Sequence, residues 1–244
     1  MKLSKILHPL YALYQVCFAW WAALLVIAIT CILISLCGRY LKIKNGDYYP
    51  ALILFRVVCW ICLIPVKVVD RDKYVKKDQN YIFVANHQGF WDVLVMYGYV
   101  KKNFKWMMKE SLRKVPLLGK ACADTDHIFV DRKTPQKDIL RKALKILKSG
   151  KSMSIFPEGT RCRNGRMGRF KKGAFVVANM SQLPVVPIAI QGSYKIMPPG
   201  SIFLHWSPII LTFHEPIISK SRDSENVEYL METSHAVIAK TLGQ

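Results

Sequence analysis

The distribution of apolar residues divides the chain into an amino-terminal part and a longer body. From Ile6 to Gly38, 33 consecutive residues include no Lys, Arg, Asp or Glu. A helix of this length extends for roughly 50 Å, whereas the hydrocarbon core of a bilayer is about 30 Å thick. A second apolar segment covers Tyr48–Val66. We therefore expect residues 1–66 to form a membrane-associated element of two helices, and residues 67–244 to form a second domain.

The charges around the two apolar segments do not place them on opposite sides of a membrane. All flanks are basic: Lys2, Lys5, Arg39, Lys42, Lys44 and Lys67. Because basic flanks favour the cytoplasmic side, a helical hairpin that enters one leaflet and returns fits the pattern. Arg56, near the middle of the second segment, argues against a second span, since a central Arg costs about 2.5–3.5 kcal/mol. A single span with its amino terminus outside and a pair of ordinary buried helices are the alternatives.

After Val69, short apolar runs alternate with stretches of helical periodicity. We expect strands at Tyr81–Ala85, Lys105–Met108, His127–Val130, Ser152–Phe156, Val185–Ile190 and Ile209–Phe213. We expect helices at Asp92–Tyr99, Thr134–Ser149, Gly173–Met180 and Ser224–Leu242. Thr134 is suited to begin the second of these helices, and Gly150 is suited to end it. The alternation predicts an α/β fold, a mixed sheet flanked by helices.

Composition narrows the class of protein. The 244 residues include 36 Lys and Arg against 16 Asp and Glu, and 52% of them are hydrophobic, which excludes a disordered chain. Seven cysteines, several of them in apolar segments, predict reduced thiols and no disulfide scaffold. A nucleic-acid-binding protein could carry the net charge of +20 but would not need so much apolar sequence. A protein at a membrane surface needs both properties.

Candidate chemistry begins after the first strand of the body, in the run Asn86-His87-Gln88-Gly89-Phe90-Trp91-Asp92. His87 and Asp92 are separated by four residues across a loop that opens a helix, so their side chains can meet. A carboxylate on one imidazole nitrogen fixes the tautomer and leaves the other nitrogen free as a base. Asp92 could instead serve only as the N-cap of the helix.

A second candidate site follows another apolar strand, in the run Pro157-Glu158-Gly159-Thr160-Arg161. Because ligands bind at the carboxyl ends of strands in α/β sheets, the two runs can converge. Six cations follow within twelve residues, with glycines between them: Arg161, Arg163, Arg166, Arg169, Lys171 and Lys172. Arg side chains match phosphate oxygens, so this stretch predicts a site for phosphate or an anionic headgroup. A solvated basic loop is the alternative.

Further cations stand at other strand ends. Lys109 begins the pattern Lys-x-x-Leu-x-x-x-Pro-x-x-Gly, which includes Leu112, Pro116 and Gly119. Asp131-Arg132 stands at the end of another strand. Val186-Pro187-Ile188 lies in an apolar strand. The histidines at 127, 205, 214 and 235 show no spacing typical of metal ligands, and we expect no metal.

This ordered set of motifs resembles the membrane glycerolipid acyltransferases, and most closely the 1-acylglycerol-3-phosphate acyltransferases. The similarity covers roughly residues 80–190. It implies that His87 is the catalytic base and that Asp92 orients it. It also implies that Lys109, Arg132 and Arg161 hold the phosphate of the acceptor, while Glu158, Gly159 and Thr160 shape that pocket. Glu158 could instead brace a neighbouring Arg. One departure is Gly89, which stands where the family often has Ser.

The resemblance implies transfer of an acyl chain from acyl-CoA or an acyl carrier protein to the sn-2 hydroxyl of 1-acylglycerol 3-phosphate, which gives phosphatidic acid. No cofactor beyond the donor thioester is implied. Membrane lipids are the expected partners, nucleic acid is not, and the expected location is the cytoplasmic face of a bacterial inner membrane. An acyltransferase acting on glycerol 3-phosphate or another lysolipid is the first alternative. A non-catalytic, basic membrane-surface or nucleic-acid-binding protein is the second.

Overall fold

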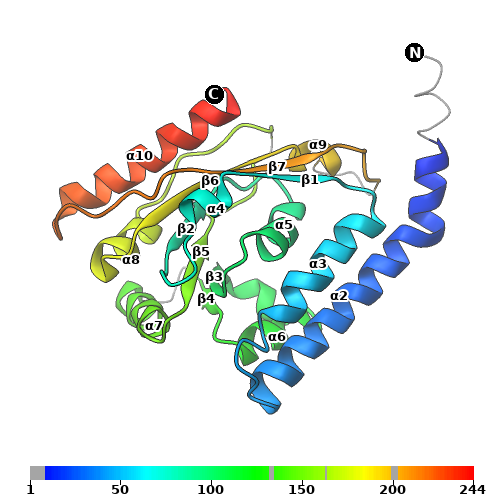
Figure 1. Ribbon diagram of the computed structural model, residues 1–244, viewed down its shortest axis with the longest axis horizontal. Helices are drawn as coiled ribbons and strands as arrows, with labels where there is room; N and C mark the ends of the chain where they lie inside the picture. The colour runs from blue at the N-terminus through cyan, green and yellow to red at the C-terminus, as the bar shows by residue number, and fades with distance from the viewer. Residues whose placement is uncertain (1–8, 132–134, 163, 199–202) are drawn as a thin grey trace.

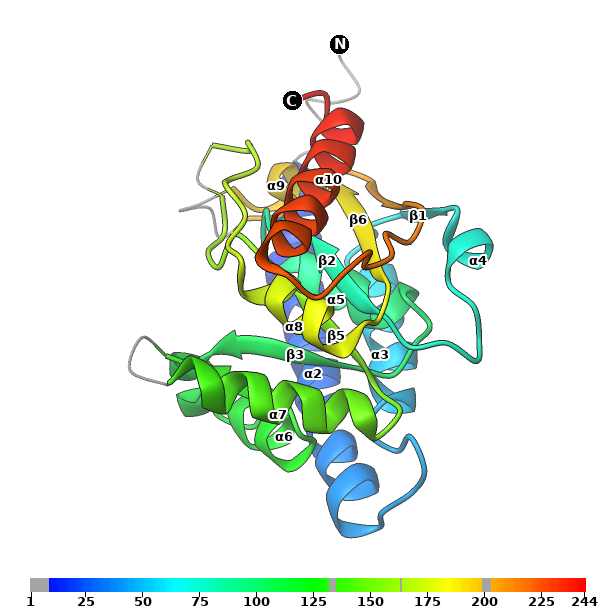
Figure 2. The same ribbon diagram turned by 90° about the vertical axis from the view of Figure 1, so that its left-hand side faces the viewer.

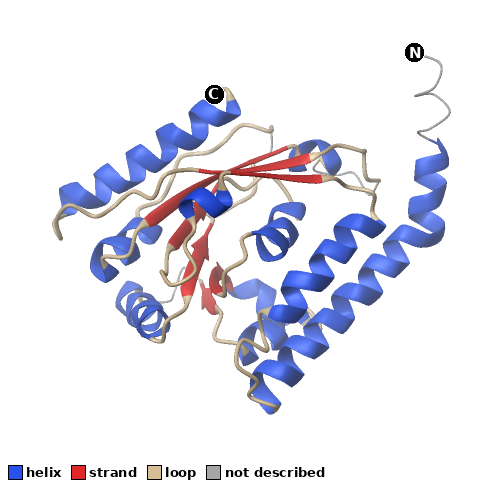
Figure 3. Cartoon of the chain, viewed as in Figure 1, coloured by secondary structure: helices blue, strands red, loops and turns tan. Residues whose placement is uncertain are grey.

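A seven-stranded sheet forms the centre of the computed structural model, which describes residues 9–131, 135–162, 164–198 and 203–244 (Figures 1 and 3). The strand order is β1-β7-β6-β2-β5-β3-β4. The strands are β1 (Val66–Val69), β2 (Ile82–Ala85), β3 (Phe104–Lys109), β4 (Ile128–Val130), β5 (Ser152–Ile155), β6 (Val185–Gln191) and β7 (Ile209–Phe213). Neighbours pair in parallel except β6 and β7, which are antiparallel. The mixed α/β sheet expected from the sequence is confirmed.

Six of the seven strands lie where the apolar runs predict them. The pattern is clear because strands buried on both faces are nearly continuous in apolar residues, and all four residues of β2 are buried. β1 was not predicted, since Val66 ends a long apolar segment and gives no separate signal. The expected division after residue 66 therefore falls at the first residue of a strand.

Helices cover both faces of the sheet, as Figure 2 shows. One face carries α3 (Tyr49–Ile61), α5 (Trp91–Tyr99) and α6 (Leu118–Asp124), with the amino-terminal helix packed outside α3. The other face carries α7 (Gln136–Lys148), α8 (Gly173–Ser181) and α10 (Ser224–Leu242). Short helices α4 (Arg71–Tyr74), α9 (Ser193–Ile196) and the 3₁₀ turn η3 (Glu110–Lys114) lie in the connections.

Two expected helix boundaries change. α5 begins at Trp91 with Phe90 at the N-cap position, so Asp92 lies within the first turn and is not the cap. α7 is described from Gln136, and the expected cap, Thr134, lies outside the described residues. Gly150 follows the end of this helix at φ +80°, the left-handed conformation typical of a C-terminal glycine.

The amino-terminal element is one long helix followed by a short one. The long helix runs from Pro9 to Tyr40 and is long and apolar enough to cross a membrane. It comprises α2 (Trp20–Ser35) between two π-helical segments, η1 (Gln15–Ala19) and η2 (Leu36–Tyr40). α2 and α3 run side by side in Figure 1. Between Gln15 and Ser35, one stripe of the long helix packs against the rest of the protein, with buried residues at both ends of this range and partly buried residues between them.

The opposite face of this helix is apolar and exposed. Its large exposed side chains include Leu13, Trp21, Leu25, Ile32 and Leu36, and Trp21 is 69% exposed. The element is therefore not a pair of ordinary buried helices, because a core helix would cover this second face. Its exposed face needs a partner that accepts apolar side chains.

The central Arg of the second apolar segment faces the sheet domain. Arg56 on α3 donates from Nε to the carbonyl oxygen of Gly98, at the end of α5. Its guanidinium also lies 5.2 Å from the centre of the Tyr99 ring. The charge thus satisfies a helix C-terminus inside the protein, which explains its position in an apolar helix. α3 itself has 13 residues, about 20 Å of helix.

Candidate active site

Three neighbouring strands bring the predicted motifs to one edge of the sheet. β2 lies between β5 and β6, and both pairs are parallel. Their carboxyl ends therefore meet at the same edge. The run from Asn86 to Asp92 follows β2, the run from Pro157 to Arg161 follows β5, and α9 follows β6. The convergence expected from the sequence is present.

His87 and Asp92 form a hydrogen-bonded pair at this edge. The distance between His87 Nδ1 and Asp92 Oδ2 is 2.8 Å. Asp92 is fully buried, and the same Oδ2 accepts hydrogen bonds from the backbone N–H groups of Gln88 at 2.6 Å and Gly89 at 2.7 Å. Because a carboxylate is an acceptor, Nδ1 donates the proton. Nε2 is then left with a lone pair, as a general base requires.

Aromatic rings fix the plane of the imidazole. The His87 ring stacks on Phe156 with centroids 4.0 Å apart and an interplanar angle of 5°. Phe156 in turn stacks on Trp106, with centroids 4.8 Å apart. The His87 side chain is 16% exposed. The base is thus held between a buried carboxylate and an aromatic face, while part of its ring reaches the solvent.

Asn86 explains why the turn leaves the sheet at this point. Its Nδ2 donates to the carbonyl oxygen of Ile190 at 2.9 Å, and the Ile190 N–H donates to Asn86 Oδ1 at 2.7 Å. The fully buried amide thereby ties the end of β2 to β6. The side chain of Asn86 thus extends the hydrogen bonding between the two strands by one residue and fixes the backbone just before His87.

Glu158 connects the two motifs through backbone groups. Its Oε1 accepts the N–H of His87 at 2.7 Å, and its Oε2 accepts the N–H of Gly168 at 2.8 Å. Burial raises the pKa of this carboxyl above its ordinary value. No ion pair among the described residues joins Glu158 to an arginine. Among the described residues, Glu158 therefore joins the turn after β2 to the loop after β5 through two backbone N–H groups, and the arginine partner considered from the sequence is not seen.

The loop after β5 surrounds a polar cavity of about 480 Å³. Its lining includes the predicted residues Glu158, Thr160 and Arg161, together with Cys162, Asn164, Arg166, Met167, Gly168 and Arg169. The three arginines are exposed, and their guanidinium groups supply the fork geometry that binds phosphate oxygens. The cavity has the lining expected of an anion site.

Gly159 shapes the start of this loop. It adopts φ +74°, and a Cβ at this position would lie 2.8 Å from Lys171 Nζ. A side chain would therefore strain the backbone and press on a cation of the loop. Gly159 is predicted by the sequence as part of the pocket, and its contribution here is conformational.

One other predicted residue, Lys109, is not part of the lining of this cavity. Lys109 is exposed at the end of β3, two strands from β2 along the same edge. Arg132 lies outside the described residues. The sequence did not assign a role to Gln88, whose Nε2 donates to the carbonyl oxygen of Gly165 at 3.3 Å. This hydrogen bond links the buried turn after β2 to the loop after β5. No pattern in the sequence indicates such a contact.

Comparisons with known proteins identify relatives of this chain. A family profile named Acyltransferase matches residues 66–191. A chloroplast 1-acyl-sn-glycerol-3-phosphate acyltransferase of Arabidopsis thaliana is 38% identical over 161 residues, which are 65% of this chain and 45% of the relative. A 1-acyl-sn-glycerol-3-phosphate acyltransferase of Saccharomyces cerevisiae is 28% identical over 85% of this chain and 69% of the relative. The chain thus spans less than half the length of the chloroplast relative.

One solved structure matches nearly the whole chain. It is the crystal structure of PlsC from Thermotoga maritima, described as a 1-acyl-sn-glycerophosphate acyltransferase. The sequences are 26% identical, the match covers 98% of both chains, and the TM-score is 0.77. The likeness therefore extends beyond the sheet to the amino-terminal helices.

Proposed function

The chain belongs to the acyltransferase family, and from this premise we propose that it transfers an acyl chain from a thioester donor to the sn-2 hydroxyl of 1-acylglycerol 3-phosphate. The observation that carries the proposal is the buried His87–Asp92 pair, 2.8 Å apart, beside a cavity lined by arginines. The relatives named for this reaction support the choice of acceptor. A non-catalytic binding protein would not need a buried carboxylate fixed on a histidine.

The proposed reaction needs no covalent enzyme intermediate, because the acceptor hydroxyl is itself the nucleophile. Its oxygen bonds to the thioester carbonyl carbon while its proton passes to Nε2 of His87. When the carbon–sulfur bond breaks, this proton passes to the departing sulfur. Asp92 keeps Nδ1 protonated and stabilises the imidazolium that forms between the two steps. The donor, acyl-CoA or an acyl carrier protein, is a substrate, and no other cofactor is part of the proposal.

Arginines of the loop after β5 are the proposed ligands of the acceptor phosphate. Arg161, Arg166 and Arg169 line one cavity with Thr160, and each guanidinium can donate two parallel hydrogen bonds. Lys109 adds a cation farther along the same edge of the sheet. Such a site holds the glycerol backbone in one orientation, so that its free hydroxyl faces His87.

We propose that the amino-terminal helix lies along a leaflet and does not cross the bilayer. The protein packs against one stripe of this helix from Gln15 to Ser35. If the helix crossed the bilayer, the parts of the protein that pack against it would have to lie within about 30 Å of hydrocarbon. The exposed apolar face then meets lipid tails, as in other interfacial helices. The lipid acceptor would reach the site from that leaflet, and the cytoplasmic face of a bacterial inner membrane stays the expected location.

Acyl transfer in phospholipid vesicles tests the proposed reaction. We expect the native chain to convert lysophosphatidic acid and a palmitoyl or oleoyl thioester to phosphatidic acid. His87→Ala is expected to lower kcat by about 10²–10⁴-fold, the usual contribution of a general base. His235→Ala is the matched control, since this histidine lies on α10 against Phe170.

Three outcomes separate the alternatives. Turnover that persists in His87→Ala contradicts the assigned base. Turnover with glycerol 3-phosphate or another lysolipid, but not with lysophosphatidic acid, keeps the base and changes the acceptor. No turnover with any acceptor contradicts the proposed function as a whole.

A further inference from the structure

Leu204, which follows α9 in the chain, is hydrogen-bonded to the amino-terminal helix through the side chain of Gln15. Gln15 is fully buried, and its Nε2 donates to the carbonyl oxygen of Leu204 at 2.7 Å. The N–H of Leu204 donates to Gln15 Oε1, also at 2.7 Å. One amide side chain therefore satisfies both backbone groups of Leu204, as a neighbouring strand would. The contact joins residues 189 positions apart.

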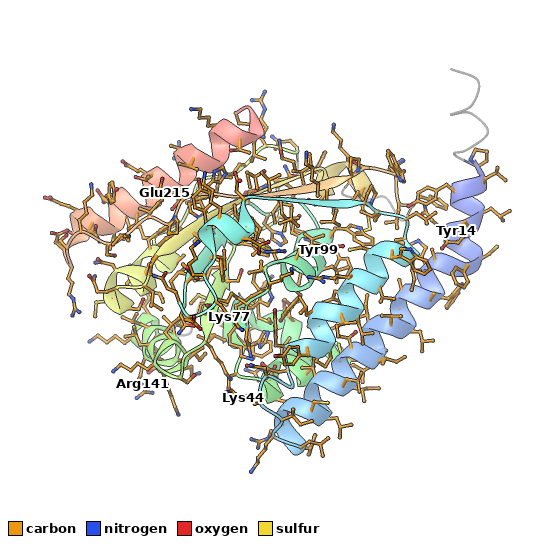
Figure 4. The ribbon with its side chains drawn as sticks, in the orientation of Figure 1. Tyr14, Lys44, Lys77, Tyr99, Arg141 and Glu215 are labelled. Atoms are coloured by element: carbon orange, nitrogen blue, oxygen red, sulfur yellow. The ribbon has the colours of Figure 1, made fainter. Side chains whose placement is uncertain are left out.

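The helix is adapted at the same place. η1, a π-helical segment, begins at Gln15, and such segments often mark functional positions. A buried amide in an apolar helix is unfavourable unless it is hydrogen-bonded, and here both of its ends are paired. The preceding turn is also fixed, because Tyr11 and Tyr14 donate from their hydroxyls to the carbonyl oxygens of Cys62 and Ile61. Figure 4 labels Tyr14 at this end of the helix.

The fixed segment turns aromatic side chains outward. Leu204 is 3% exposed, whereas Phe203 is 45% exposed and Trp206 is 58% exposed. On the helix, close to Gln15 in the chain, Val16 and Phe18 are more than half exposed. Trp and other amphipathic aromatic residues favour the boundary between lipid tails and headgroups. Exposed apolar side chains therefore flank both Gln15 and Leu204, which the two hydrogen bonds hold together.

We propose that Phe203 and Trp206 form a second lipid contact, which enters the headgroup region of the leaflet that receives the amino-terminal helix. This inference rests on the membrane association in the proposed function. The occupant is a phospholipid leaflet because the aromatic pair adjoins the helix that is apolar enough to enter one. The segment follows α9, and Ser193 of α9 lies beside Gly89 of the site. The contact therefore sets the distance between the leaflet and the catalytic edge.

Fluorescence quenching by brominated lipids tests the contact directly. The native chain, Trp206→Phe and Trp21→Phe are reconstituted in phosphatidylcholine and phosphatidylglycerol vesicles with or without brominated acyl chains. The native emission minus that of each variant isolates one tryptophan. Trp21 is 69% exposed on the helix and serves as the positive control. We expect bromination to quench both difference spectra, and Trp206 to become inaccessible to acrylamide in the buffer.

The other outcomes contradict the proposal in distinguishable ways. If Trp21 is quenched and Trp206 is not, the helix meets lipid but the second contact does not exist, and a protein partner or second copy is the remaining occupant. If neither is quenched while acyl transfer continues, membrane insertion itself is wrong and the reaction stands.

Kinetics provide the functional arm of the test. We expect the double variant Phe203→Asp, Trp206→Asp to raise the KM for lysophosphatidic acid in vesicles by about tenfold, because two apolar contacts are lost. The rate with a short-chain acceptor dissolved in buffer should be unchanged, which a misfolded variant would not show. Ile218→Asp is the matched control, since Ile218 is 67% exposed in the connection between β7 and α10. An unchanged KM in vesicles contradicts the proposal.

Discussion

The two sides of the candidate site are built in opposite ways. On one side, five of the seven residues from Asn86 to Asp92 are buried, and hydrogen bonds within the protein hold the Asn86 amide and the His87 ring in place. On the other, the loop that follows Glu158 exposes three arginines around a cavity. The turn contains no Lys or Arg, whereas the loop is rich in them.

The difference separates chemistry from recognition. A base must hold one orientation and one tautomer, and burial beside a paired carboxylate provides both. Groups that bind a phosphate must remain solvated until the ligand arrives, because an unpaired buried guanidinium would be very unfavourable. Glu158 keeps the two sides in register through the N–H groups of His87 and Gly168. Substitutions in the turn should therefore lower kcat, and those in the loop should raise KM.

Asp92→Asn gives the largest expected effect. The neutral amide cannot stabilise the imidazolium, and an NH₂ group would face a buried region in which Asp92 Oδ1 has no described partner. We expect kcat to fall by about 10²–10⁴-fold with KM nearly unchanged. Steady-state kinetics and circular dichroism measure this, with Asp138→Asn on α7 as the control. A kcat within threefold of the native value would show that the carboxylate is only structural.

Glu158→Gln should affect both sides at once. The amide offers one acceptor oxygen, so either the His87 N–H or the Gly168 N–H loses its partner. A buried donor without a partner costs about 1–3 kcal/mol. We expect kcat to fall and KM for the acceptor to rise, with kcat/KM lower by about 10–100-fold. A change in KM alone would mean that the brace serves only the loop.

The same substitution should change the dependence of stability on pH. Because burial raises the pKa of Glu158, the folded chain retains this proton over a window above the ordinary value, where the unfolded chain has lost it. The contribution of the group is thus present below that window and is lost as pH rises through it. In Glu158→Gln, this part of the decrease in stability with rising pH should be absent. Measurements of Tm at successive pH values for the native chain and the variant check this.

The sequence predicted what depends on local patterns. Six strands were found because each is a short apolar run, and His87 was linked to Asp92 because both lie in one turn. The Glu158–His87 contact spans 71 residues and the Gln15–Leu204 contact spans 189. Such contacts depend on how the sheet assembles, so no spacing in the chain reveals them. β1 was missed for a related reason, since its identity as a strand comes from its pairing with β7.

Arg161→Ala should have an intermediate effect that appears in binding. Removing one guanidinium leaves Arg166 and Arg169 in the same cavity, so we expect the KM for lysophosphatidic acid to rise by about tenfold, with kcat within a few fold. Arg141→Ala is the control, because this side chain is 80% exposed on α7 and is not part of the lining of the cavity. A kcat loss as large as that of Asp92→Asn would remove the distinction between the two sides.

Gly89→Ser should have the smallest effect, although it introduces the residue that the family resemblance predicts at this position. The Gly89 N–H bonded to Asp92 is a backbone group and survives the substitution. A Cβ would lie 3.5 Å from the Ser193 carbonyl oxygen, an ordinary contact, and the added hydroxyl could donate to that oxygen. We therefore expect kcat to change by less than about threefold, and stability to rise by about 0.5–1.5 kcal/mol, one hydrogen bond. Thermal unfolding and steady-state kinetics measure both, and Gly89→Ala separates the hydroxyl from the added methyl group. A kcat gain above about tenfold in Gly89→Ser alone would mean that the hydroxyl takes part in catalysis, and that the buried turn is not yet complete as it stands.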